Sequence, residues 1–250
     1  MDQSVFEKVH RLQKEGFWFW AGRNKITLAL LEKHDLQISD HVILDIGSSE
    51  GAFLDYLKSR RLKFTGIDID EKAIEFCRKR GLGDNIRYGN IKDIPFEEES
   101  FNIVTALDIV EHVDDDLKAM REINRILVRG GISLIIVPAY QWLWSKNDVA
   151  YHHQRRYSRK SFIQLAEKGG LKIEQWSYFN FFLFPAFVVI TLFSILFPGK
   201  VKTSSVLKPL PGPVNYLLKQ IIFFEIWLIT KLGISLPFGS SMIFVLRKNN

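Results

Sequence analysis

Hydrophobic residues divide the chain into short apolar runs separated by amphipathic segments. The runs have the length and content of buried strands, and they lie at 42–46, 63–69, 86–88, 101–107 and 132–137. Apolar residues at helical spacing mark the segments between them, at 52–60, 71–80 and 114–127. Strands that alternate with helices in this way pair in parallel, so we expect an α/β fold built on a parallel sheet.

The pattern continues beyond residue 137 with further elements. A helix should begin at a cap on Ser158 or Ser161 and end near Lys168, and a sixth strand should follow at 171–178. Residues 242–248 have the apolar character of a last strand that returns to the sheet. Earlier in the chain, we expect the pair Gly130 and Gly131 to cap the end of the helix that starts near residue 114.

A hydrophobic insertion of about 60 residues separates the sixth strand from the last one. Residues 175–199 carry no charged side chain, so by length they could span a membrane. A single crossing would leave the last strand on the far side, and Glu225 in the second helix, 216–232, would be costly in hydrocarbon. The pattern therefore favours a shallow membrane contact. A helical pair buried against the domain or against another subunit is the alternative.

Charge is unevenly distributed and points to the same region. Residues 1–150 hold 21 Lys and Arg against 25 Asp and Glu, whereas residues 151–250 hold 13 against 3. Basic residues beside long apolar runs indicate an anionic membrane surface and no nucleic acid, and anionic headgroups could meet Lys200, Lys202 and Lys208. The single Cys77 and the charged N-terminus, which does not read as a secretory signal, fit a cytoplasmic protein.

The most informative motif is VILDIGSSEGAF at 42–53. It reads as a strand that enters a tight glycine turn and then a helix, which is how a nucleotide-binding βαβ unit begins. The second strand ends in Asp68, 21 residues after Gly47, and a carboxylate there can accept both hydroxyl hydrogens of a ribose.

This motif resembles the first motif of the class I S-adenosylmethionine-dependent methyltransferases, with Ser49 in place of the middle glycine. The resemblance implies a Rossmann-like sheet of seven strands, mostly parallel, with an antiparallel last strand between the fifth and the sixth. It implies S-adenosyl-L-methionine as cofactor and no metal, with cofactor contacts from Asp45, Gly47, Ser49, Gly51, Asp68, Ile69, Asn90, Ile91, Asp108 and Arg23. Asn90 stands where the family usually has Asp.

Three parts of the chain follow from the resemblance. Residues 1–40 would form an N-terminal helical cap, in which an aromatic cluster at 17–20 separates two helices. Residues 41–180 and 239–250 would form the methyltransferase domain, and residues 181–238 the hydrophobic insertion. The N-terminal helices could instead only cover the core. If they cap the cofactor, Arg23 can reach its carboxylate.

Two other interpretations of the glycine turn stay open. A dinucleotide site needs a second glycine for close approach to a pyrophosphate, and Ser49 occupies that place beside the negative charge of Asp45. The letters GSSEG also match the nucleophile elbow of hydrolases, with Ser49 as nucleophile. That fold needs earlier strands, and the mostly helical pattern before residue 42 does not supply them.

Candidate catalytic residues follow the fourth and fifth strands. His112 comes just after Glu111 and could act as a base, line the pocket or join a metal site, although two adjacent ligands make a poor metal set. The segment after Pro138 leaves the ligand edge of the sheet and adds His152 and His153 as further candidate bases. The same segment supplies candidate acceptor-binding residues, which are Tyr140, Trp144, Arg155, Arg156 and Tyr157. The two arginines could instead be a solvated loop.

The sequence therefore predicts an enzyme that moves a methyl group from S-adenosylmethionine to a small apolar or lipid-linked acceptor. It would work peripherally or monotopically at the inner face of the membrane. The alternative is a non-catalytic adaptor that uses the cofactor fold as a scaffold and docks a membrane partner through the insertion. The departures at Ser49 and Asn90 keep that alternative open. No pattern indicates the oligomeric state.

Overall fold

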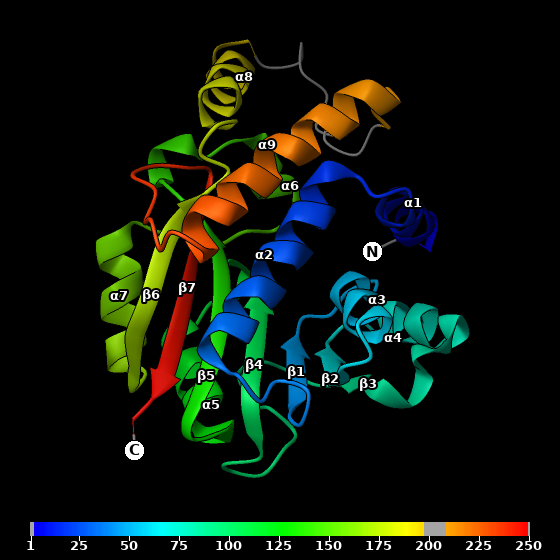
Figure 1. Ribbon diagram of the computed structural model, residues 1–250, viewed down its shortest axis with the longest axis vertical. Coiled ribbons are helices and arrows are strands. Elements are labelled where there is room, and N and C mark those ends of the chain that lie inside the picture. Colours follow the sequence, from blue (N-terminus) through cyan, green and yellow to red (C-terminus); the bar gives the residue numbers. More distant parts are fainter. Residues whose placement is uncertain (1–2, 198–208, 250) are drawn as a thin grey trace.

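A seven-stranded sheet organises the molecule, which we describe from a computed structural model covering residues 3–197 and 209–249 (Figure 1). The strand order is β3-β2-β1-β4-β5-β7-β6. The strands are β1 Val42–Ile46, β2 Lys63–Asp68, β3 Ile86–Tyr88, β4 Phe101–Leu107, β5 Leu127–Pro138, β6 Leu171–Phe179 and β7 Ser241–Lys248. The α-helices are α1 Gln3–Lys14, α2 Trp18–His34, α3 Ala52–Ser59, α4 Glu71–Cys77, α5 Asp116–Ile126, α6 Lys146–Ala150, α7 Arg159–Lys168, α8 Phe184–Leu196 and α9 Gly212–Thr230.

The predicted topology is confirmed. Strands β1 to β5 pair in parallel, and β7 pairs antiparallel with both β5 and β6. The last strand therefore lies between the fifth and the sixth. The apolar run of β5 from Ile132 to Val137 is buried on both faces, as expected for a strand covered by helices on each side of the sheet.

Two boundaries differ from the sequence-based prediction. Helix α5 ends at Ile126, and Gly130 and Gly131 belong to strand β5, so the prediction that they cap the helix is wrong. Leu127 already pairs with Phe101, and the register shifts before Ile132 pairs with Ile103. Because of this pairing with β4, strand β5 begins at Leu127, before the two glycines. In addition, no helix separates β3 from β4, because residues 89–100 form a loop.

The N-terminal helices and the insertion pack together. Gly22 of α2 faces Ile222 of α9 so closely that an added Cβ would lie 2.4 Å from its Cγ2 atom. Asn215 joins α9 to the turn between α1 and α2, since it accepts from the backbone N–H of Trp18 at 2.8 Å. Figure 1 shows α2 and α9 running alongside each other in front of the sheet. One face of the insertion is therefore buried against the domain.

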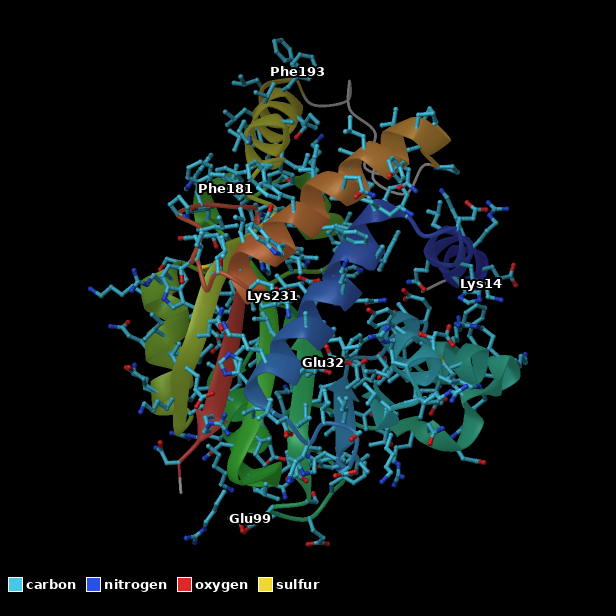
Figure 2. All side chains as sticks on the ribbon, in the orientation of Figure 1. Lys14, Glu32, Glu99, Phe181, Phe193 and Lys231 are labelled. Atoms are coloured by element: carbon cyan, nitrogen blue, oxygen red, sulfur yellow. The ribbon has the colours of Figure 1, made fainter. Side chains whose placement is uncertain are left out.

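Helix α8 is different, because it leaves the body of the molecule above the end of β6 (Figure 1). Its exposed apolar side chains are Val189, Ile190, Leu192, Phe193, Ile195 and Leu196, and Figure 2 shows Phe193 at the outer end of the molecule. Within residues 3–197 and 209–249, no helix combines the length and apolar composition needed to cross a membrane. Lys200, Lys202 and Lys208 lie outside the described residues.

Candidate active site

The glycine turn after β1 is held against the end of β2. The backbone N–H groups of Gly47 and Ser48 donate to Ile67 O, and that of Ser49 donates to Asp68 Oδ2 at 2.7 Å. Ser49 and Gly51 both have positive φ, of 48° and 78°. Glycine adopts such angles without cost, whereas Ser49 adopts its positive φ at some strain.

Asp68 is the carboxylate that this turn surrounds. Its side chain is buried, and its second oxygen accepts from Asp70 N at 2.8 Å. Burial raises the pKa of Asp68, while the N–H groups of Asp70 and Ser49 oppose that rise. A carboxylate offers about four lone pairs, so Asp68 can still accept a hydrogen bond from a ribose hydroxyl. The structure therefore brings the turn and the acid to one place.

A second buried acid lies beneath the turn. Asp45 accepts from the Thr105 hydroxyl at 2.7 Å, and burial raises the pKa of Asp45 to about 6. The turn itself is closed by Ile109, because a Cβ on Gly47 would lie 2.3 Å from the Ile109 Cδ1 atom. Acids around this turn favour a cationic ligand, such as a sulfonium or an ammonium group, and oppose a phosphate.

The N-terminal helices cover the turn. Gln13 of α1 donates a hydrogen bond to Glu50, and Leu12, Phe17 and Trp20 form a small apolar cluster against Ala52. On α2, Arg23 lies 3.0 Å from Asp108 through its Nε atom and also donates to Leu107 O. Arg23 thus reaches the ligand edge of the sheet, at the end of β4.

The remaining predicted cofactor residues lie after β2 and β3. Ile69 is 63% exposed, whereas Ile91 is buried. The amide oxygen of Asn90 accepts from Lys92 N at 2.9 Å, which fixes the side chain in the loop after β3. That oxygen keeps one lone pair, and the amide N–H groups of Asn90 have no hydrogen-bond partner among the described residues.

Strained backbone conformations concentrate at the same edge of the sheet. Non-glycine residues with positive φ follow the carboxyl ends of four strands, and they are Ser49 after β1, Asp108 after β4, Tyr140 after β5 and Asn180 after β6. Such conformations persist where the surrounding structure enforces them, often at functional sites. In an open α/β sheet, the carboxyl edge is also where ligands bind.

Two of the three candidate histidines meet at this edge. His112 and His153 approach edge to face, with their ring centroids 4.7 Å apart, whereas His152 is exposed. Burial and, to a smaller degree, His153 lower the pKa of His112. Glu111 lies beside both rings and is fully buried, and burial together with nearby Asp108 raises its pKa well above the usual range.

Aromatic side chains form the wall on the β5 side. Tyr140 stacks on Tyr178 at a centroid distance of 5.3 Å and meets Phe184, the first residue of α8, at 5.5 Å. Trp144 is half-buried. The base of the insertion therefore adjoins the aromatic residues that the sequence predicts for acceptor binding.

The predicted cationic wall is already engaged with carboxylates. Arg156 pairs with buried Asp148 through Nε at 2.7 Å, and Arg155 pairs with Asp116 at 2.7 Å. The Tyr157 hydroxyl donates to the same Asp116 at 2.9 Å. Asp148 and Asp116 stand in the first turns of α6 and α5, where acidic residues are common. No pattern in the sequence therefore marks them as partners of the two arginines.

The contacts of Ser49 do not resemble those of a hydrolase nucleophile. Its hydroxyl donates to the Glu50 carboxylate at 2.7 Å. A nucleophilic serine needs a base, usually histidine, within hydrogen-bond reach. Among the described residues, no histidine is hydrogen-bonded to Ser49.

Comparisons with known proteins find several methyltransferases. Residues 44–135 match the profile of the family described as "Methyltransferase domain". A Mycolicibacterium smegmatis protein named "Probable S-adenosylmethionine-dependent methyltransferase" is 25% identical over 165 residues, covering 65% of this chain and 62% of the relative. The ubiquinone biosynthesis O-methyltransferase of Idiomarina loihiensis is 27% identical over 113 residues, covering 43% and 46%. The chain spans about half the length of these curated relatives.

The fold is also similar to that of solved methyltransferase structures. The structure of Haemonchus contortus phosphoethanolamine N-methyltransferase 2 in complex with S-adenosyl-L-methionine matches with a TM-score of 0.57 at 17% identity, covering 91% of this chain and 53% of the other. The strand order, the turn beside Asp68 and the match over residues 44–135 show that this chain has the class I methyltransferase fold, and the relatives that it resembles include S-adenosylmethionine-dependent methyltransferases.

Proposed function

We propose that this protein transfers a methyl group from S-adenosylmethionine to a small apolar or lipid-linked acceptor at the cytoplasmic face of a membrane. The observation that carries the first half is the 2.7 Å hydrogen bond between Ser49 N and Asp68, which joins the glycine turn to the ribose-binding acid. When bound, the cofactor supplies a methyl group that its sulfonium has already activated.

In this proposal, different residues around the turn bind different parts of the cofactor. In this proposal Asp68 holds the ribose, while Asn90 and Ile91 face the adenine. Gly47, Ser49 and Gly51 shape the backbone against the amino-acid end. The negative charges of Asp45 and Asp108 favour the sulfonium and ammonium groups, and Arg23 is placed to pair with the cofactor carboxylate once it releases Asp108.

Catalysis then requires alignment in a site that excludes water. Holding the acceptor atom in line with the methyl carbon and the sulfur lowers the entropy cost of the reaction. Tyr140 and Trp144 would pack against the acceptor. An acceptor that must lose a proton would use His112 or His153, which are half-buried at the ligand edge.

The apolar insertion supports the choice of acceptor and location. Helix α8 begins at Phe184, 5.5 Å from Tyr140, and exposes a continuous set of aliphatic and aromatic side chains. Monomeric proteins rarely leave such a patch in water, and a lipid surface would cover it. A lipid-linked acceptor held in that surface would reach the wall of the site.

Cofactor binding is tested by calorimetry with S-adenosylmethionine. We expect Asp68→Ala to weaken binding at least tenfold, because two charge-assisted hydrogen bonds to the ribose are lost. Asp68→Asn keeps an acceptor for Ser49 N and should weaken binding to a similar degree, which separates ligand loss from loop collapse. Asp84→Ala, at an exposed position in the turn before β3, is the control. Unchanged affinity in both Asp68 variants would reject the proposed pocket.

The membrane half is tested by co-sedimentation of the purified protein with vesicles. We expect binding to anionic phosphatidylglycerol vesicles to exceed binding to neutral phosphatidylcholine vesicles, and added salt to weaken it. Protein that stays in the supernatant with both lipids would contradict the proposed location while leaving the cofactor site intact.

A further inference from the structure

Glu111, His112 and His153 gather at the ligand edge of the sheet, although 41 positions separate the last two in sequence. Glu111 and His112 belong to the short 3-10 turn Val110–His112 after β4, and His153 lies in the loop after α6. One ligand atom from each side chain lies within 4.8 Å of the other two. We propose that these three residues bind a divalent transition-metal ion such as Zn²⁺, Mn²⁺ or Co²⁺.

The carboxylate of Glu111 is the feature of this cluster that most needs a cation. The side chain is fully buried, and within the described part of the chain neither of its oxygens has a hydrogen-bond partner. Leaving such a group unpaired in the interior is costly, and buried polar atoms almost always have a partner. The two guanidinium groups whose charges act on Glu111 have carboxylate partners of their own, since Arg23 pairs with Asp108 and Arg156 pairs with Asp148. A bound cation would complete the site.

His153 is oriented for metal binding by the carboxylate behind it. Its Nδ1 lies 2.9 Å from Asp148 Oδ1, and the Asp148 side chain is completely buried. With Nδ1–H donating to the carboxylate, the lone pair of Nε2 is free to bind a metal. Histidine ligands of metals usually have such a carboxylate behind them, because it fixes the tautomer and the ring orientation.

Asp148, which orients His153, is itself held by several hydrogen bonds. Asp148 also holds Arg156 Nε at 2.7 Å and accepts from the Ser145 backbone N–H in a capping box at the start of α6. Next to the histidine, Gln154 N donates to Glu111 O at 2.7 Å and so ties the two segments together. The three side chains are therefore held near one another before any ion binds.

The donor set indicates the class of ion. Two imidazole nitrogens and one carboxylate suit zinc, manganese, iron or cobalt better than magnesium or calcium, which prefer oxygen ligands throughout. Three protein ligands leave coordination positions open, which is typical of catalytic sites. This step rests on the proposed function but replaces its histidine base: with His112 and His153 bound to the ion, an acceptor hydroxyl would take an open position, where the ion would lower its pKa so that its proton leaves to solvent before the oxygen accepts the methyl group.

The test is titration of the chelator-treated protein with CoCl₂, followed by its visible absorption bands, and with ZnCl₂ by calorimetry. We expect one ion per chain. We also expect Glu111→Gln, His112→Asn and His153→Asn each to weaken binding at least tenfold, because each removes one of three ligands. His152→Asn is the matched control: this neighbour is exposed and lies outside the cluster, and asparagine tolerates its φ of 59°.

The outcomes separate this site from the cofactor pocket. Asp68→Ala should keep the cobalt bands while it weakens S-adenosylmethionine binding. Thermal unfolding of the apo variants shows whether each one folds, and added ZnCl₂ should raise the melting temperature of the wild type but not of Glu111→Gln. Cobalt binding that is absent, or that His152→Asn abolishes and the three ligand variants do not, would overturn the proposal.

Discussion

The central strands and the insertion are both rich in apolar residues, yet they bury them to very different degrees. In β4 and β5, Ile103, Val104, Leu134 and Ile135 are completely buried. Helix α8 has a more uniformly apolar sequence, and of its residues only Thr191 is buried. Hydrophobic character alone therefore does not place a segment in the core.

The difference comes from what each segment packs against. A strand inside a sheet has neighbours on both sides and helices on both faces, so each of its side chains finds a cover. Helix α8 contacts the rest of the protein mainly at its base, near Tyr140 and Phe238. Helix α9 is intermediate, because it buries Ile222, Glu225 and Ile226 and exposes Phe224 and Trp227.

The largest effect should come from truncating a core aromatic. Phe244 of β7 is completely buried and stacks on Phe162 with centroids 4.3 Å apart. We expect Phe244→Ala to lower the free energy of unfolding by about 3–5 kcal/mol, measured by urea denaturation. Phe193→Ala on α8, where the ring is 45% exposed, should change it by less than about 1 kcal/mol. Equal losses would mean that α8 is as tightly packed as the sheet.

The next prediction concerns the acid buried under α9. Glu225 Oε2 accepts from Phe181 N at 2.9 Å, and its other oxygen has no hydrogen-bond partner among the described residues. Burial raises the pKa of Glu225 from 4.5 to about 7. Because the folded state holds this proton more tightly, stability should be greatest below pH 4.5 for this group and should fall as the pH rises to 7.

A variant isolates this contribution. At pH 8 the ionised Glu225 costs up to about 3 kcal/mol, since each pKa unit is worth about 1.4 kcal/mol. Glu225→Gln keeps the acceptor for Phe181 N and removes the charge, so it should stabilise the protein at pH 8 and have little effect at pH 5. Urea denaturation of both proteins at the two pH values measures this difference. A gain that is equal at both pH values would contradict the assignment.

These examples show which features the sequence could predict. The strand order and the antiparallel last strand followed from apolar runs and from the family resemblance, because both depend on local pattern. The burial of Glu225 within the mostly apolar helix α9 could not be predicted, since it depends on Phe181, which follows β6 and lies 44 positions earlier. The sequence favoured a shallow membrane contact because Glu225 would be costly in hydrocarbon. In the structure, Glu225 is buried inside the protein, where it accepts a hydrogen bond from Phe181 N.

Some features of the candidate site could likewise be predicted from the sequence, and others could not. The proximity of Ser49 to Asp68 followed from the spacing of the motif, which places both at the ends of adjacent strands. The roles of Arg155 and Arg156 did not, because their acidic partners lie on α5 and α6 and long-range ion pairs leave no periodic signal. The grouping of His153 with Glu111 likewise depends on how the loop after α6 folds back.

A third prediction tests whether α9 belongs with the domain. An added Cβ at Gly22 would lie 2.4 Å from Ile222 Cγ2, so Gly22→Ala must displace α9 from α2. We expect a net loss of about 1–3 kcal/mol in urea denaturation, even though alanine favours helix formation. Gly212→Ala is the matched control, because nothing lies within 4 Å of a Cβ at that position of α9. A neutral Gly22→Ala would show that the two helices are not held together.

The smallest effect on stability should accompany a clear loss of membrane binding. Leu196 of α8 is 71% exposed, so Leu196→Ser should change the free energy of unfolding by less than about 0.5 kcal/mol. If lipid covers α8, the same change removes an apolar side chain worth about 1.5 kcal/mol or more, and partitioning into anionic vesicles should fall about tenfold. Leu36→Ser is the control, since Leu36 is 91% exposed but lies after α2, outside the insertion. Equal loss of vesicle binding in both variants would indicate nonspecific adsorption, and no loss in either would show that α8 does not meet lipid.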